Sequence, residues 1–106
     1  MNVIELNLPE TVDAVEFDRM NESMLLLIDG KTSQPWVLDF ASVSYMGSSM
    51  LGMVVNVRQR IKSAGGKLVL CGMSPRLVEI FRMCSMERLF TIVKTKNDAV
   101  RVLGRS

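Results

Sequence analysis

Short strand-like segments alternate with helix-like segments along the whole chain. Residues 3–8 alternate apolar and polar side chains, and residues 36–40, 67–72 and 91–93 are short, mainly apolar runs typical of strands. Each of these segments is followed by one with apolar residues at helical spacing. Such a regular alternation with short connections favours right-handed crossovers and a largely parallel sheet. The sequence therefore predicts a single α/β domain over residues 1–106, with about four strands and helices packed against them.

Capping residues and glycines indicate where the helices begin and end. Ser, Thr, Asp and Asn favour helix N-termini because their side chains accept hydrogen bonds from the first free N–H groups, and proline fits the first turn. Glycine favours the position after a helix because it adopts positive φ without strain. The predicted caps are Thr11 or Asp13, Ser74 (before Pro75) and Asn97, and the predicted stops are Gly30 and Gly65–Gly66.

Composition excludes several classes of protein. With 48% hydrophobic and 23% charged residues, the 106-residue chain is globular rather than disordered. The apolar run at residues 24–28 stops at Asp29, so no segment is long enough to cross a bilayer, and the start of the chain does not resemble a signal peptide. The expected location is therefore the cytoplasm, without membrane insertion.

The chain also lacks the residues that most catalytic and metal sites need. It contains no histidine, and its two cysteines, Cys71 and Cys84, form no CxxC pair. A zinc site or a Cys–His nucleophile is therefore not expected. We expect no metal, no cofactor and no enzymatic activity of its own.

Charge is divided unevenly along the chain. Eight acidic and two basic residues precede Val54, whereas three acidic and 11 basic residues occur from Val54 onward. The basic residues are spread over several predicted elements, and the chain has one Trp and one Tyr. A nucleic-acid interface usually gathers its cations on one surface among aromatic residues, so binding to nucleic acid is not expected.

The connection before the second predicted helix, residues 45–52, has the most distinctive chemistry. Binding sites in open α/β sheets form beyond the carboxyl ends of the strands, where helix N-termini favour anions. Ser48 or Ser49 there is open to three interpretations: a helix cap, a neighbour of a bound phosphate, or a phosphorylation site. Gly47 and Gly52 match the glycine spacing of a phosphate loop, but the Lys–Ser/Thr pair that should follow is absent, so a nucleotide hydrolase is not supported.

The second predicted helix has an unusually wide apolar arc. On a helical wheel its apolar residues cover roughly 200°, more than one core-facing stripe requires. Two interpretations remain open. One edge near the serines stays exposed for a partner, or the first helix and the chain ends cover it. The residues of the arc are Met50, Leu51, Met53, Val54, Val55, Val57, Ile61 and Ala64.

At this point the chain resembles a known family, the STAS domain of bacterial anti-sigma factor antagonists. The family pattern is a hydrophobic–Asp–hydrophobic strand, a loop reading Asp-Ser-Ser/Thr-Gly-Leu-Gly, a helix, Gly-Gly, a strand, and Ser-Pro opening a third helix. Here Gly47 stands where the family usually has Asp, and Met50 where it usually has Gly. The matching segments are Val37-Leu38-Asp39-Phe40, Val43-Ser44-Tyr45-Met46-Gly47-Ser48-Ser49-Met50-Leu51-Gly52, Gly65-Gly66-Lys67-Leu68-Val69-Leu70-Cys71, Ser74-Pro75 and Met86-Glu87-Arg88-Leu89-Phe90.

The resemblance implies a protein that switches partners rather than a catalyst. In the family, the first serine of the loop is phosphorylated by a serine-kinase anti-sigma factor, which releases that partner, and a phosphatase restores binding. Ser48 is the matching acceptor, and a homodimer remains open. The expected partner contacts are Gly47, Ser49, Met50, Leu51, Met53 and Val55.

Two other functions remain open from the sequence. STAS domains also occur in membrane transport complexes, so the chain could be an accessory subunit of an ABC-type transporter. The helix N-terminus could instead sense a small ligand or nucleotide, because it favours anions.

Overall fold

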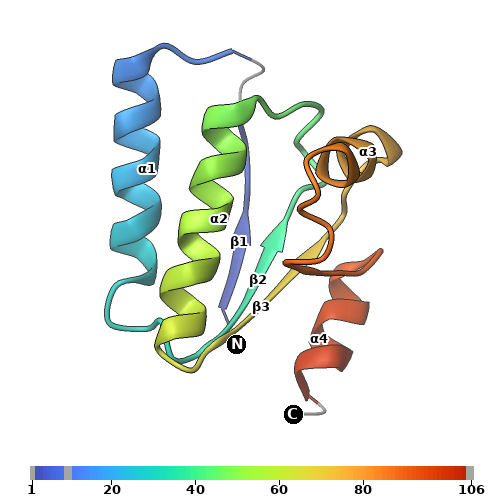
Figure 1. The fold of residues 1–106 in the computed structure, drawn as a ribbon. Coiled ribbons are helices and arrows are strands. Elements are labelled where there is room, and N and C mark those ends of the chain that lie inside the picture. The colour runs from blue at the N-terminus through green and yellow to red at the C-terminus, as the bar shows by residue number, and fades with distance from the viewer. Residues whose placement is uncertain (1, 9–10, 105–106) are drawn as a thin grey trace.

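The computed structural model describes residues 2–8 and 11–104, in which four strands alternate with four helices (Figure 1). The sequence also predicts that the first strand ends at Pro9, which lies outside these residues. The elements are β1 (Asn2–Glu5), α1 (Ala14–Ile28), β2 (Pro35–Asp39), α2 (Ser48–Ser63), β3 (Lys67–Cys71), α3 (Pro75–Met83), β4 (Thr91–Ile92) and α4 (Lys96–Gly104).

The strands form one parallel sheet in the order β1-β2-β3-β4, which is also their order along the chain. Leu38 of β2 pairs with Ile4 of β1 and with Leu70 of β3. The predicted α/β class with a parallel sheet is therefore confirmed. Because successive crossovers all advance in one direction and are right-handed by default, their helices fall on one face of the sheet.

The two faces of the sheet have separate cores. On one face Trp36, Leu38 and Leu70 join the large cluster that includes buried residues of α1, α2 and α3. On the other face Val37 and Cys71 belong to a smaller cluster contributed by α4, which packs on β2 and β3. Successive strand residues point to opposite faces, which explains why the central strands are apolar at consecutive positions.

The predicted caps have mixed outcomes. Asp13 caps α1 by accepting a hydrogen bond from the backbone N–H of Glu16 at 2.8 Å, and this bond lowers the pKa of the Asp13 carboxyl. Ser74 caps α3 in the same way. The prediction for Asn97 is wrong, because α4 already begins at Lys96. The hydroxyl of Thr95 accepts the hydrogen bond from the backbone N–H of Asp98 instead.

The end of α2 is closed by two glycines, as the sequence indicates. Gly65 has φ +82°, and its N–H donates to the carbonyl of Lys62, while the N–H of Gly66 donates to the carbonyl of Ile61. These two hydrogen bonds form a Schellman motif, which satisfies carbonyls that the helix leaves free. The motif turns the chain directly from α2 into β3.

Within the described part of the chain, none of the helices combines the length and the apolar character that a bilayer crossing requires.

Candidate functional site

The start of α2 lies at the carboxyl edge of the sheet, beside the ends of β1 and β2 (Figure 1). The loop before it is fixed to the core, because Val43 and Met46 are buried. A turn with a hydrogen bond from the N–H of Val43 to the carbonyl of Phe40 begins this loop. The first turn of α2 therefore has a defined position next to the loops where α/β proteins bind ligands and partners.

Gly47, rather than a serine, is the N-cap of α2. Its backbone is extended (φ −82°, ψ 178°), and no side chain caps the helix. Ser48 and Ser49 are the first two helical residues, and both are exposed. The interpretation of either serine as the helix cap is therefore wrong. Ser48 is the first residue of α2, and its hydroxyl does not cap the helix.

The first turn of α2 favours negative charge. It contains no acidic residue. Among the described residues, no hydrogen-bond partner is found for the backbone N–H groups of Ser48, Ser49 and Met50, whereas the next N–H, that of Leu51, donates to Gly47. A helix N-terminus with free N–H groups carries about half a positive charge. An anionic group attached at Ser48 would thus meet a favourable electrostatic environment from its own helix.

Three expected partner contacts are part of the core instead. Met50, Leu51 and Met53 are only 4%, 7% and 2% exposed and belong to the large hydrophobic cluster. Of the two interpretations left open for the apolar arc, the exposed edge near the serines is wrong for these side chains, which are covered. The reason is that α2 is flanked by α1, by the sheet and by residues of α3 at the same time, so a wide apolar arc is needed to fill its surroundings.

The surface that remains at this end of α2 carries two serine hydroxyls, two glycines and one aliphatic side chain. Ser48, Ser49 and Gly52 are exposed, while Gly47 and Val55 are half-buried. Positions 48, 52 and 55 recur at helical spacing and share one face. We call these five residues the Ser48 surface.

A cation over the ring of Tyr45, in the loop before α2, was not foreseen from the sequence. The guanidinium of Arg76, in the first turn of α3, lies 5.2 Å from the centre of the Tyr45 ring, and the tyrosine is partly exposed. The parallel topology accounts for their meeting, because α2 and α3 both begin at the carboxyl edge of the sheet. From the sequence, one can predict only that Arg76 lies in the first turn of a helix, because it follows Ser74 and Pro75. That position does not indicate that Tyr45 is its neighbour.

Cys71, Lys96 and the carboxylates near them take part in the packing and the ion pairs of the fold. In residues 2–8 and 11–104 no three His, Cys, Asp or Glu side chains gather into a metal-binding group. Burial, and next the carboxylate of Asp39, raise the pKa of the Cys71 thiol, which disfavours the reactive thiolate. Lys96 bridges Glu5 at 3.0 Å and Asp39 at 3.6 Å, and its hydrogen bond to Glu5 raises its pKa. These two ion pairs connect the start of α4 to β1 and β2.

The free N-cap position gives a prediction for stability. A Cβ atom added at Gly47 meets no atom within 4 Å, so Gly47→Asp fits and its carboxylate can accept from the first-turn N–H groups. We expect a gain of about 1 kcal/mol in the free energy of unfolding, from the cap and from the helix dipole. Urea unfolding at pH 7 measures it.

The matched control is Gly47→Ala, which adds a Cβ without an acceptor and is expected to give no gain in the free energy of unfolding, because alanine is a poorer N-cap residue than glycine. The gain of the aspartate variant should also fade below about pH 4, as the carboxyl becomes protonated. An equal gain in both variants would show that the cap is not its cause.

Comparisons with known proteins identify one family. A family model described as the STAS domain matches residues 1–99. The anti-sigma-B factor antagonist of Listeria monocytogenes is 32% identical over 89 residues, which are 84% of this chain and 67% of that protein.

Solved structures have the same fold. A STAS domain protein from Planctomyces limnophilus, named an anti-sigma-factor antagonist, superposes with a TM-score of 0.82 at 24% identity, covering 96% of this chain and 89% of that one. The Bacillus cell fate determinant SpoIIAA in its phosphorylated form gives a TM-score of 0.64 at 20% identity, covering 93% and 86%.

Proposed function

Because the chain belongs to the STAS domain family, we propose that it is a non-catalytic regulator of the anti-sigma factor antagonist type. It binds an anti-sigma factor with serine-kinase activity through the Ser48 surface. Phosphorylation of Ser48 by that kinase releases the partner, and a phosphatase restores binding. The names of the Listeria relative and of the Planctomyces structure support the antagonist type.

The observation that carries the proposal is the exposed Ser48 hydroxyl at a helix N-terminus where no side chain serves as a cap. A kinase can reach this hydroxyl without breaking a helix cap. The described N–H groups of the first turn can then interact favourably with the phosphate, so the modified domain remains folded. That SpoIIAA, which shares the fold, has been solved in a phosphorylated form is consistent with this.

Phosphorylation would act mainly on the interface. A phosphoserine carries about −1.5 to −2 charges at pH 7. A partner that fits the unmodified Ser48 surface would have to remove water from this charge or bring like charges close to it. Like charges placed together in an interface cost several kcal/mol, so the affinity should fall by about 100-fold or more.

The test uses the full chain, a purified serine-kinase anti-sigma factor from the same cells, and ATP. Mass spectrometry should find one added phosphoryl group on the wild type and on Ser49→Ala, and none on Ser48→Ala. Ser49→Ala is the matched control, because it removes a neighbouring hydroxyl that is equally exposed. Calorimetry should show that the phosphorylated protein and Ser48→Asp bind the kinase far more weakly than the wild type.

Two results would contradict the proposal. One is the absence of any mass gain together with full binding by Ser48→Asp. The other is co-purification with a membrane transport complex rather than with a kinase, which would favour the accessory-subunit alternative.

A further inference from the structure

We propose that the chain has a second binding site, for a small amphipathic carboxylate, in a cavity between α2, α4 and the start of β3. The cavity has a volume of about 300 Å³, at the lower end of the range for small-molecule sites. Its lining includes no residue of the Ser48 surface, and the α2 residues that contribute to it begin at Arg58, about 15 Å along the helix from Ser48. The inference is independent of the proposed function.

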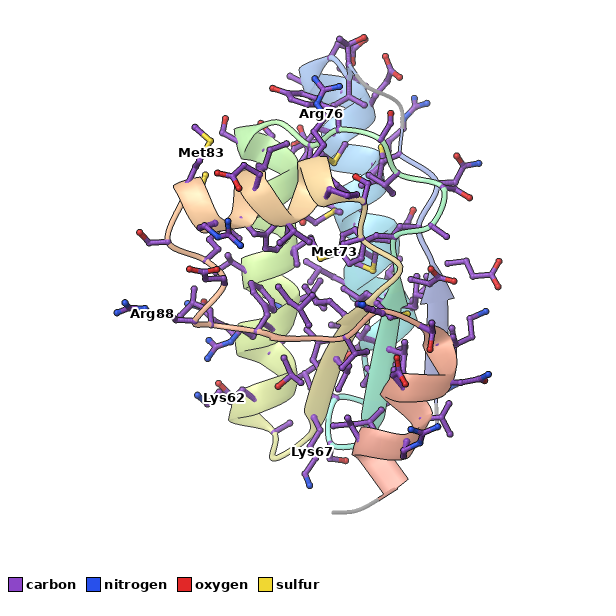
Figure 2. The ribbon with its side chains drawn as sticks, turned by 90° about the vertical axis from the view of Figure 1, so that its right-hand side faces the viewer. Lys62, Lys67, Met73, Arg76, Met83 and Arg88 are labelled. Carbon is purple, nitrogen blue, oxygen red and sulfur yellow. The ribbon has the colours of Figure 1, made fainter. Side chains whose placement is uncertain are left out.

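The cavity exists because β4 covers only part of β3. The two residues of β4 pair with Val69 and Leu70, so Lys67 and Leu68 have no partner strand on that side within the described residues. The chain entering β4 is held by Arg58 of α2, whose guanidinium donates to the carbonyl of Leu89 and lies 5.9 Å from the centre of the neighbouring phenylalanine ring. Figure 2 shows this side: the chain entering β4 crosses above the start of β3, with α2 on one side and α4 on the other.

Apolar side chains form much of the lining. Ile61 and Leu103 are buried at its sides, and Leu68 is half-buried on β3. Leu89 and Val102 also line the cavity and are 41% and 40% exposed. An apolar body placed in the cavity would remove these surfaces from water, which is favourable.

The positive charge of the lining favours a ligand with an anionic head group. Arg58, Lys62 and Lys67 contribute three cations, and no acidic side chain is among the described lining residues. Neither lysine forms an ion pair with a described residue. In Figure 2 the two lysines project from the end of α2 and the start of β3. An anion would therefore find two unpaired ammonium groups at this site, whereas a cation would be repelled.

The probe is octanoate, titrated into the isotope-labelled full chain and followed by NMR. We expect saturable shifts of the backbone amides of Leu68, Leu89 and Val102, and no comparable shifts at Ser48 or Ser49. Octylammonium has the same apolar chain with the opposite charge, and it should bind about tenfold more weakly.

Variants test the assignment of the charges. The double variant Lys62→Gln, Lys67→Gln should weaken octanoate about tenfold, because it removes two exposed cations. Lys94→Gln is the matched control, since this lysine is exposed but does not line the cavity, and it should leave the affinity unchanged. All three lysines are exposed, so both variants should keep the wild-type melting temperature. The Ser48→Ala variant should bind octanoate like the wild type, which separates this proposal from the previous one.

Three outcomes would overturn the proposal. The first is equal binding of octanoate and octylammonium. The second is an unchanged octanoate affinity in the double lysine variant. The third is the absence of octanoate binding together with shifts of the Lys67 and Leu68 amides by an acidic peptide, which would indicate that the open edge of β3 takes up a strand from another protein instead.

Discussion

Replacing Gly66 by alanine is expected to destabilise the protein by about 3 kcal/mol, because the added methyl group overlaps atoms that cannot easily move. A Cβ atom at this position would lie 2.1 Å from the carbonyl oxygen of Thr32, 2.8 Å from that of Gln34 and 2.9 Å from the side chain of Ile61. Two of these neighbours are backbone atoms of the connection into β2. Urea unfolding followed by circular dichroism measures the loss.

Gly52→Ala is the matched control for this prediction. Gly52 lies within α2, on a side of the helix that faces solvent, and a Cβ atom there meets nothing within 4 Å. Alanine at such a position should raise the free energy of unfolding by about 1 kcal/mol. The two Gly→Ala changes should thus have opposite signs. A neutral Gly66→Ala would mean that the connection into β2 yields without cost.

Phe81→Ala should cost about 4 kcal/mol, within the usual range for removing a fully buried phenylalanine. Phe81 is 0% exposed and makes edge-to-face contacts with Phe40, at a ring distance of 6.3 Å, and with Phe90, at 5.8 Å. These contacts connect α3 to the end of β2 and to the chain entering β4. The free energy of unfolding, again from urea titration, is the measurement.

Met83→Ala on the same helix provides the comparison. This side chain is 77% exposed, so its removal should change the free energy of unfolding by less than about 0.5 kcal/mol. Similar losses in both variants would contradict the assignment of the loss to the aromatic contacts of Phe81, because alanine favours a helix more than either residue that it replaces.

Local signals in the sequence predicted most of the fold. Strand and helix patterns gave the element order and the parallel sheet, and the caps at Asp13 and Ser74 are confirmed because capping depends on residues only a few positions apart. The cap at α2 could not be assigned correctly, because a glycine N-cap carries no side-chain signal. At α4, Thr95 and Asn97 are both residue types that cap helices, and they lie only two positions apart, so the pattern does not decide between them.

The candidate site was predicted less completely. Periodicity located the apolar arc of α2, but it does not report what covers each side, so Met50 and Met53 were expected on the surface and are buried. The contact between Tyr45 and Arg76 depends on the position of α3 relative to α2, which no single segment encodes. The cavity beside β3 depends on how late β4 begins, and strand boundaries are not precisely given by an apolar run.

The packing of α4 on the second face of the sheet has a consequence for biosynthesis. Val37, Val69 and Cys71 are covered by Ala99 and Leu103, which are among the last described residues. On the ribosome, the strands emerge before the helix that shields them. Until translation has passed Leu103, the nascent domain exposes an apolar sheet face of the kind that chaperones bind and that promotes aggregation.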